Sequence, residues 1–103
     1  MKTLFPDELS VTENYKLLIG SVLPRPIAFV STVSEAGVYN LAPFSFFTGV
    51  CSKPLTIAFC PSIRGTDGHK KDTLINIEAN GEFVVNVVSE SFVDAMNTTA
   101  GEF

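Results

Sequence analysis

The stretch that decides the fold runs from residue 23 to residue 50 and reads LPRPIAFVSTVSEAGVYNLAPFSFFTGV. Its apolar, β-forming runs end in small hydroxylated residues, and a turn-forming segment, Ser34 to Gly37, separates the first two runs. Because Gly37 can adopt a positive φ, this segment predicts a β-hairpin. Strand ends of this kind offer backbone amides and hydroxyls to a polar ligand beside apolar walls. The simpler interpretation is a hairpin whose serines and threonines only face water, since alternation alone specifies no ligand.

The composition is that of one small globular domain. The chain has 103 residues, of which 46% are hydrophobic and 17% charged, which is enough for one modest core. Its formal net charge of −4 argues against general nucleic-acid binding, because the phosphate backbone would be repelled. No apolar run approaches the ~18 residues that span a membrane, and residues 1–20 lack the pattern of a signal peptide. The sequence therefore predicts a cytoplasmic protein without membrane or nucleic-acid partners.

The apolar pattern predicts short strands over residues 27–33, 38–41, 45–51, 55–60 and 82–88. We expect Pro43 to break the pairing of the second strand, because proline lacks an N–H. The run at 55–60 is dense in apolar residues, which predicts a strand that is covered on both faces.

A first helix is expected over residues 13–19, capped by Thr12 and ended by Gly20. Its expected buried side is formed by Leu17, Leu18 and Ile19.

Two further helices are predicted in the second half of the chain. One begins at Asp72, the expected cap, carries an apolar stripe and ends at Asn80–Gly81. The other starts near Ser89 or Ser91 and includes Met96.

Four or five strands with two or three short helices predict a mainly β protein, a β-barrel with short helices. A small barrel usually needs about five or six strands to close, and the last predicted element is a helix with nothing after it to pack upon. Either another chain completes the core or the sequence is a fragment of a longer protein, and we favour the fragment.

Residues 62–73, SIRGTDGHKKDT, place glycines, hydroxyls and three cations directly before a helix N-terminus. Unpaired amides and the helix dipole attract anions there, and phosphate is the natural guest. The alternative is a solvated loop followed by a helix cap. Neither a Gly-x-x-x-x-Gly-Lys-Ser/Thr loop nor a Gly-x-Gly-x-x-Gly motif is present, so nucleotide hydrolysis and a Rossmann dinucleotide site are unsupported.

The other reactive side chains define no catalytic site. His69 is the only histidine, and Cys51 and Cys60 lack further ligands at metal-binding spacing, so no metal site is predicted and both cysteines are expected to be reduced. The carboxylates form no acid–base pair. The phenylalanines at 44, 46 and 47 are, on their own, more typical of a core than of a cofactor wall, and Asn86 within a valine-rich strand needs hydrogen-bond partners.

Four segments in order resemble the flavin reductase-like proteins with an FMN-binding split barrel, the branch that includes flavoredoxin. They are residues 24–32 (PRPIAFVST), 40–47 (NLAPFSFF), 71–77 (KDTLINI) and 83–86 (FVVN). The resemblance covers about residues 15 to 100. It implies that residues 1–103 are the single N-terminal part of such a domain, and that the split barrel is incomplete in this chain.

The resemblance also implies noncovalently bound FMN, usually in a homodimer, and assigns no catalytic residue. The implied cofactor-binding residues are those that line the flavin, wrap its ring and ribityl chain, or reach its phosphate: Ser31, Thr32, Val33, Ala42, Pro43, Phe44, Ser45, Phe46, Phe47, Ser62, Arg64, Lys71 and Thr73.

The implied function is that of an oxidoreductase domain in which NADH or NADPH gives a hydride to flavin, so that the chemistry belongs mainly to the cofactor. Two alternatives stay open at this point. One is a non-enzymatic FMN-binding electron carrier on the same fold, and the other is a structural or assembly fragment without a ligand.

Overall fold

The computed structural model describes residues 1–61 and 68–99, and every structural statement below concerns these residues. Two predicted phosphate-contacting residues, Ser62 and Arg64, lie outside the described residues.

The strands form two small antiparallel sheets. The first sheet has the order β2-β1-β5, with β1 at Ala28–Val33, β2 at Tyr39–Phe44 and β5 at Val84–Asn86. The second sheet is a hairpin of β3 (Phe47–Ser52) and β4 (Leu55–Phe59). Strand β1 is therefore central to the first sheet. The expected strand at 82–88 is shorter than predicted, because only three residues of β5 pair with β1.

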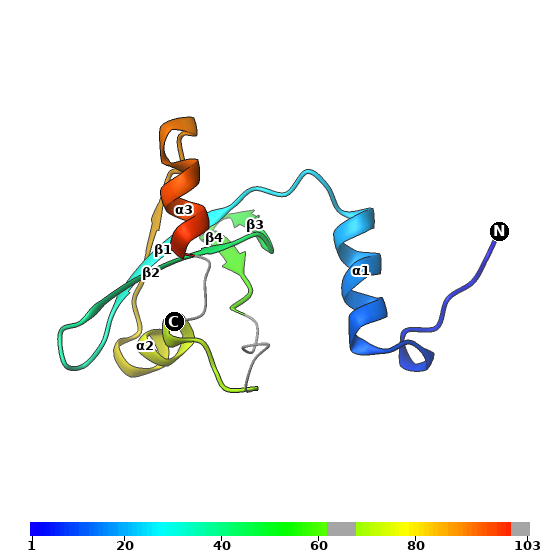
Figure 1. Cartoon of the computed structure of the whole chain (residues 1–103), viewed down its shortest axis with the longest axis horizontal. Helices are drawn as coiled ribbons and strands as arrows, with labels where there is room; N and C mark the ends of the chain where they lie inside the picture. Colours follow the sequence, from blue (N-terminus) through cyan, green and yellow to red (C-terminus); the bar gives the residue numbers. More distant parts are fainter. Residues whose placement is uncertain (62–67, 100–103) are drawn as a thin grey trace.

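Two helices lie against the first sheet, and a third stands apart from it (Figure 1). Helix α2 (Asp72–Asn80) contacts β1 and β2, and helix α3 (Val93–Thr99) packs against β2 after the 3-10 turn η2 (Glu90–Phe92). At the other end of the molecule, the 3-10 turn η1 (Pro6–Glu8) leads into α1 (Val11–Ser21), which stands beside the sheets on an extended connection. The mainly β architecture with short helices agrees with the prediction.

The β1–β2 hairpin forms as its sequence predicts, although β2 is longer than expected. Gly37 takes a φ of 84° in the turn, a value that favours glycine. Pairing continues through Pro43, which lies opposite Phe29, so the expectation that Pro43 breaks the ladder is wrong. Strand β2 is at the edge of its sheet, and an edge strand tolerates a proline because the missing N–H can face the open side.

The main core cluster is small and lies on one face of the first sheet, while the buried Phe29 and Met96 lie outside this cluster. Ala28, Val30 and Phe44 form its centre, and a partly buried shell packs around them, consisting of Ala42, Phe47, Phe59 and Val85. The rings of Phe44 and Phe59 have centroids 5.2 Å apart, and this contact joins the two sheets.

Strand β4 is not covered on both faces, contrary to the prediction. Leu55 is 87% exposed and Ile57 is 41% exposed. The reason is that β3 and β4 form a sheet of only two strands, and among the described residues only the Phe47–Phe59 end of the hairpin reaches the core.

Helix α1 also differs from its prediction. Ser10, rather than Thr12, is the N-cap, and it forms a capping box with Glu13: the Ser10 hydroxyl accepts from the Glu13 N–H, and the Ser10 N–H donates to Glu13 Oε1. Hydrogen bonding to Ser10 lowers the pKa of Glu13. The backbone N–H of Ser10 makes the larger contribution, and the Ser10 side chain makes a smaller one. The helix continues through Gly20 to Ser21.

The expected buried side of α1 is largely exposed. Leu17 and Leu18 are 42% and 46% exposed, because few of the described residues contact this helix. Its attachments are a ring contact between Tyr15 and Phe46, with centroids 6.0 Å apart, and two bonds from Arg25 Nη1 to the carbonyl oxygens of Ile19 and Val22. The radius of gyration, 15.5 Å, exceeds the roughly 13 Å expected for a compact chain of this length.

Candidate functional site

The start of α2 is bonded to the edge of the first sheet. Thr73 is buried, and its hydroxyl accepts a hydrogen bond of 2.9 Å from Asn40 Nδ2 on β2. Lys71 is the N-cap residue, and in the described part of the chain its side chain forms no capping bond. The expectation that Asp72 caps this helix is wrong, since Asp72 is already its first residue. Gly81 ends the helix with a φ of 75°, as predicted.

Two adjacent lysines at this helix start are held differently. Lys71 is partly buried, and its ammonium nitrogen lies 5.3 Å from the centroid of the Phe44 ring. Lys70 instead forms an ion pair with Glu78, with 3.0 Å between Nζ and Oε2. Lys71 thus keeps its positive charge over the aromatic core, whereas the charge of Lys70 is matched by a carboxylate on the same helix.

Lys71 and the first turn of α2, together called the α2 corner, have chemistry that suits an anion. The first turn of an α-helix has N–H groups without intrahelical acceptors, and the helix dipole is positive there. Lys71 adds an ammonium group, while the Asp72 carboxylate in the same turn works against an anion. Because a lysine N-cap cannot accept a hydrogen bond, these N–H groups are not satisfied by the cap side chain.

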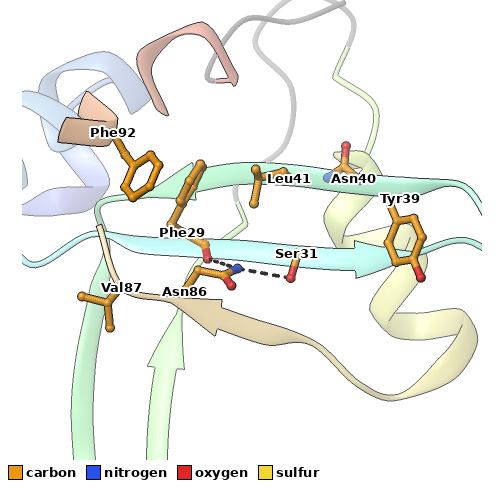
Figure 2. A pocket seen from close by; sticks show the side chains of 8 residues that line it. All are labelled: Phe29, Ser31, Tyr39, Asn40, Leu41, Asn86, Val87 and Phe92. Carbon is orange, nitrogen blue, oxygen red and sulfur yellow. Dashed lines mark hydrogen bonds between the residues drawn. The ribbon is translucent and has the colours of Figure 1, made fainter. Parts of the chain in front are cut away.

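An open groove lies on the opposite face of the first sheet (Figure 2). Its volume is about 590 Å³, within the range of small-molecule sites. It is lined by residues of β1, β2, the end of β5 and η2, namely Phe29, Ser31, Tyr39, Asn40, Leu41, Asn86, Val87 and Phe92. Two hydrogen bonds explain why an asparagine stands in this valine-rich strand. Asn86 Nδ2 donates to the Phe29 carbonyl at 3.0 Å and to the Ser31 hydroxyl at 3.2 Å.

The predicted residues 31–33 do not share one surface, because side chains alternate along a strand. Ser31 lines the groove. Thr32 is buried on the other face, where its hydroxyl accepts a bond of 3.0 Å from Asn76 of α2. The Val33 carbonyl oxygen accepts a bond of 2.7 Å from Asn80 of α2.

The predicted residues 42–47 also diverge. Ala42, Phe44 and Phe47 belong to the core and the shell around it. Ser45 is exposed in the turn before β3. Phe46 lies under the Arg25 guanidinium, whose carbon is 5.3 Å from the ring centroid, and beside Tyr15.

The structure thus brings together Lys71, Phe44 and Thr73 at one corner, with Asn40 beside them. Asn40 was part of the family-like segment but was not predicted as a site residue. Among the lining residues of the groove, Ser31 was a predicted site residue, and the others were missed. Phe29 and Ser31 are two residues apart on β1, and Tyr39 and Leu41 are two residues apart on β2. Because residues at this spacing share one face of a strand, the sequence did contain a signal for this surface.

The described residues also show the state of the cysteines, the arrangement of metal-ligating side chains and the length of the helices. Cys51 and Cys60 are free thiols, as expected. Within residues 1–61 and 68–99, no group of three or more His, Cys, Asp or Glu side chains is arranged to hold a metal ion. None of the described helices is both long and apolar enough to cross a membrane.

The fold is that of a flavin reductase-like split barrel, and this chain covers about half of a solved structure with that fold. Residues 19–103 match the family described as flavin reductase like domain. The chain therefore belongs to the flavin reductase-like family.

Curated relatives are similar over most of this chain. An uncharacterised protein of Halalkalibacterium halodurans is 54% identical over 97 residues, which are 94% of this chain and 46% of the relative. YwrF of Bacillus subtilis, also uncharacterised, is 49% identical over 94 residues, or 91% of this chain and 45% of YwrF. The chain spans about half the length of the curated relatives it matches.

Solved structures confirm the fold. Component B of nitrilotriacetate monooxygenase from Bacillus cereus is 44% identical with a TM-score of 0.85, over 100% of this chain and 50% of the other. The 2-nitrobenzoate 2-nitroreductase NbaA of Pseudomonas fluorescens is 32% identical with a TM-score of 0.83, over 99% of this chain and 48% of the other. Flavoredoxin of Desulfovibrio vulgaris, with a TM-score of 0.65 and 23% identity over 77% of this chain and 40% of the other, shares the fold.

Replacing Asn86 with leucine should destabilise the protein, because the Ser31 hydroxyl and the Phe29 carbonyl lose a partly buried donor. The expected loss is about 1–2 kcal/mol of unfolding free energy, measured by urea denaturation. Val84→Ala is the matched control, since Val84 is on the same strand and 59% exposed, and it should change stability by less than about 0.5 kcal/mol. Equal losses in the two variants would show that the Asn86 bonds contribute nothing specific.

Proposed function

We propose that this chain supplies the FMN-binding part of a flavin-dependent oxidoreductase in which NADH or NADPH reduces the flavin. The observation that carries the proposal is the α2 corner, where Lys71 stands at an N-terminus without a side-chain cap in a member of the flavin reductase-like family. Bound FMN would supply the redox chemistry, accepting a hydride from the nicotinamide.

The residues at the corner fit a phosphate. The first-turn N–H groups of α2 and the Lys71 ammonium are the donors that phosphates prefer. The Thr73 side chain, in contrast, is 1% exposed, and its hydroxyl accepts a hydrogen bond from Asn40 of β2. Lys71 is therefore assigned to hold the phosphate, and Thr73, Ser62 and Arg64 stay in the proposed set from the family resemblance alone.

The flavin ring and ribityl chain are assigned to the strand ends 31–33 and to the segment 42–47, again from the family resemblance. Thr32 is buried and its hydroxyl is bonded to Asn76, so its place in this set rests on the family resemblance alone. Ser45 is exposed at the β2–β3 turn, so its hydroxyl is accessible to a ligand. These residues would bind and orient the flavin rather than react with it.

The named relatives support an oxidoreductase. Nitrilotriacetate monooxygenase component B and 2-nitrobenzoate 2-nitroreductase both carry redox names and are more than 30% identical to this chain. Because the chain covers about half of each of these proteins, its own activity remains part of the proposal.

The proposal predicts that added FMN accelerates NADH or NADPH oxidation by the purified protein beyond the rate with free FMN. The physical reason is that a bound flavin is held in place for the nicotinamide to stack on it. Nicotinamide oxidation is followed by absorbance, with riboflavin in place of FMN as the control. Binding of FMN without this acceleration would instead indicate an electron carrier, and unchanged FMN fluorescence on titration would indicate a fragment that binds no flavin.

Changing Lys71 to alanine should weaken FMN binding roughly 10- to 100-fold and leave riboflavin binding nearly unchanged, because riboflavin lacks the phosphate that Lys71 would contact. Flavin fluorescence titration measures both affinities. Lys70→Ala is a matched control, since Lys70 is the adjacent cation but is paired with Glu78, and its effect should be much smaller. Equal losses for FMN and riboflavin in Lys71→Ala would remove Lys71 from the phosphate site.

We also propose a cytoplasmic homodimer. Helix α1 supports the dimer, because Leu17, Leu18 and Val22 leave much of their apolar surface exposed on a helix that stands beside the sheets (Figure 1).

Leu18→Lys should shift the protein from dimer to monomer in sedimentation velocity, because a lysine would be buried in an apolar contact without a partner. Thr12→Lys adds the same charge at an exposed polar position of α1 and serves as the control. A dimer that survives Leu18→Lys would place the interface elsewhere, and a monomeric unsubstituted protein would refute the dimer.

A further inference from the structure

The side of α2 that faces the first sheet is polar rather than apolar. Thr73 is 1% exposed and Asn76 is 6% exposed, and these are the buried residues of the helix. With Asn80 they stand at positions i, i+3 and i+7, which lie on one side of an α-helix. The apolar Ile75, in contrast, is 49% exposed. Leu74 and Ile77 are partly buried, so the fully buried residues of this helix are polar instead of forming the usual apolar stripe.

Three hydrogen bonds attach this side of α2 to β1 and β2. Asn76 Nδ2 donates to Thr32 Oγ1 at 3.0 Å, and Asn80 Nδ2 donates to the Val33 carbonyl at 2.7 Å. Thr73 Oγ1 accepts from Asn40 Nδ2 at 2.9 Å. Asn40 and Thr32 are themselves direct partners across the β1–β2 ladder. We call these three bonds the α2 seam.

Such a seam determines where the helix lies along the sheet. Apolar contacts tolerate sliding, whereas a directional bond between buried groups does not, because a slip leaves a buried donor and acceptor unpaired. A single buried asparagine sets the register of paired helices in coiled coils for the same reason. A slip of one residue would move α2 by about 1.5 Å along its axis and rotate it by about 100°.

The helix position matters because Lys71 lies close to Thr73, the first α2 residue of the seam. Its ammonium nitrogen is placed over the Phe44 ring, 5.3 Å from the centroid, only two residues before Thr73. We propose that the α2 seam, with Asn76 as its central positioning residue, fixes the Lys71 ammonium and the first-turn N–H groups of α2 where they recognise a phosphate. This role rests on the proposed FMN site, but the seam itself can be tested without any flavin.

The experiment compares the unsubstituted full chain with Thr32→Val/Asn76→Leu and with Ile75→Ala. The double variant removes both buried partners of the central bond, so neither is left unpaired and the fold should be retained. Asn76→Leu alone leaves the Thr32 hydroxyl without its donor and should be less stable than the double variant. Ile75→Ala changes the same helix outside the seam and is the matched control.

Two quantities are measured for each protein. The first is the NMR chemical shift of the Lys71 side-chain protons, which the Phe44 ring current displaces in the protein without flavin. The second is the ratio of the riboflavin and FMN dissociation constants from fluorescence titration, which reports phosphate recognition. A purely stabilising role for Asn76 would alter the urea midpoint and neither of these quantities.

We expect the double variant to lose the Lys71 ring-current displacement and to lower the riboflavin-to-FMN ratio roughly tenfold, whereas Ile75→Ala keeps both. A double variant that folds and retains the displacement would overturn the positioning role. If the unsubstituted protein shows no preference for FMN over riboflavin, the proposed phosphate site fails, and the Lys71 displacement still decides whether the seam positions α2.

Discussion

The alternation of side chains along β1 is the constraint on which the rest of the structure depends. Val30 and Thr32 point to the face that holds the core and α2, and Phe29 and Ser31 point to the open groove. Because β1 is the central strand of its sheet, each of its residues also determines what its neighbours on β2 and β5 can face. A register slip of one residue would move Thr32 away from α2 and Ser31 out of the groove.

The strands and turns follow from local sequence signals, and the prediction of both was largely correct. Gly37 and Gly81 have the positive φ values that a tight turn and a helix end require. The cap of α1 also had a local signal that the prediction passed over, since Ser10 and Glu13 have the spacing of a capping box. The end of α1 had none, because Gly20 inside a helix resembles a glycine that ends one.

The residues that α2 buries could not be predicted from the helix sequence alone. The apolar residues of the helix suggested one orientation, but Thr73 and Asn76 are buried because their partners Asn40 and Thr32 lie 33 and 44 residues away. The candidate site was therefore only partly predictable. Charge and helix polarity indicated the Lys71 corner, whereas the groove and the division of residues 31–33 between two faces depend on how three strands pair.

An acidic chain can still present a cationic corner, because charges in water are screened over roughly 10 Å. Near the start of α2 the local balance is set by Lys71, the first-turn N–H groups and the opposing Asp72 carboxylate. The Glu78 carboxylate on the same helix is paired with Lys70, which reduces its repulsion of an anion. The two neighbouring lysines thus act together: Lys70 offsets a negative charge of α2, and Lys71 keeps a positive charge available over the Phe44 ring.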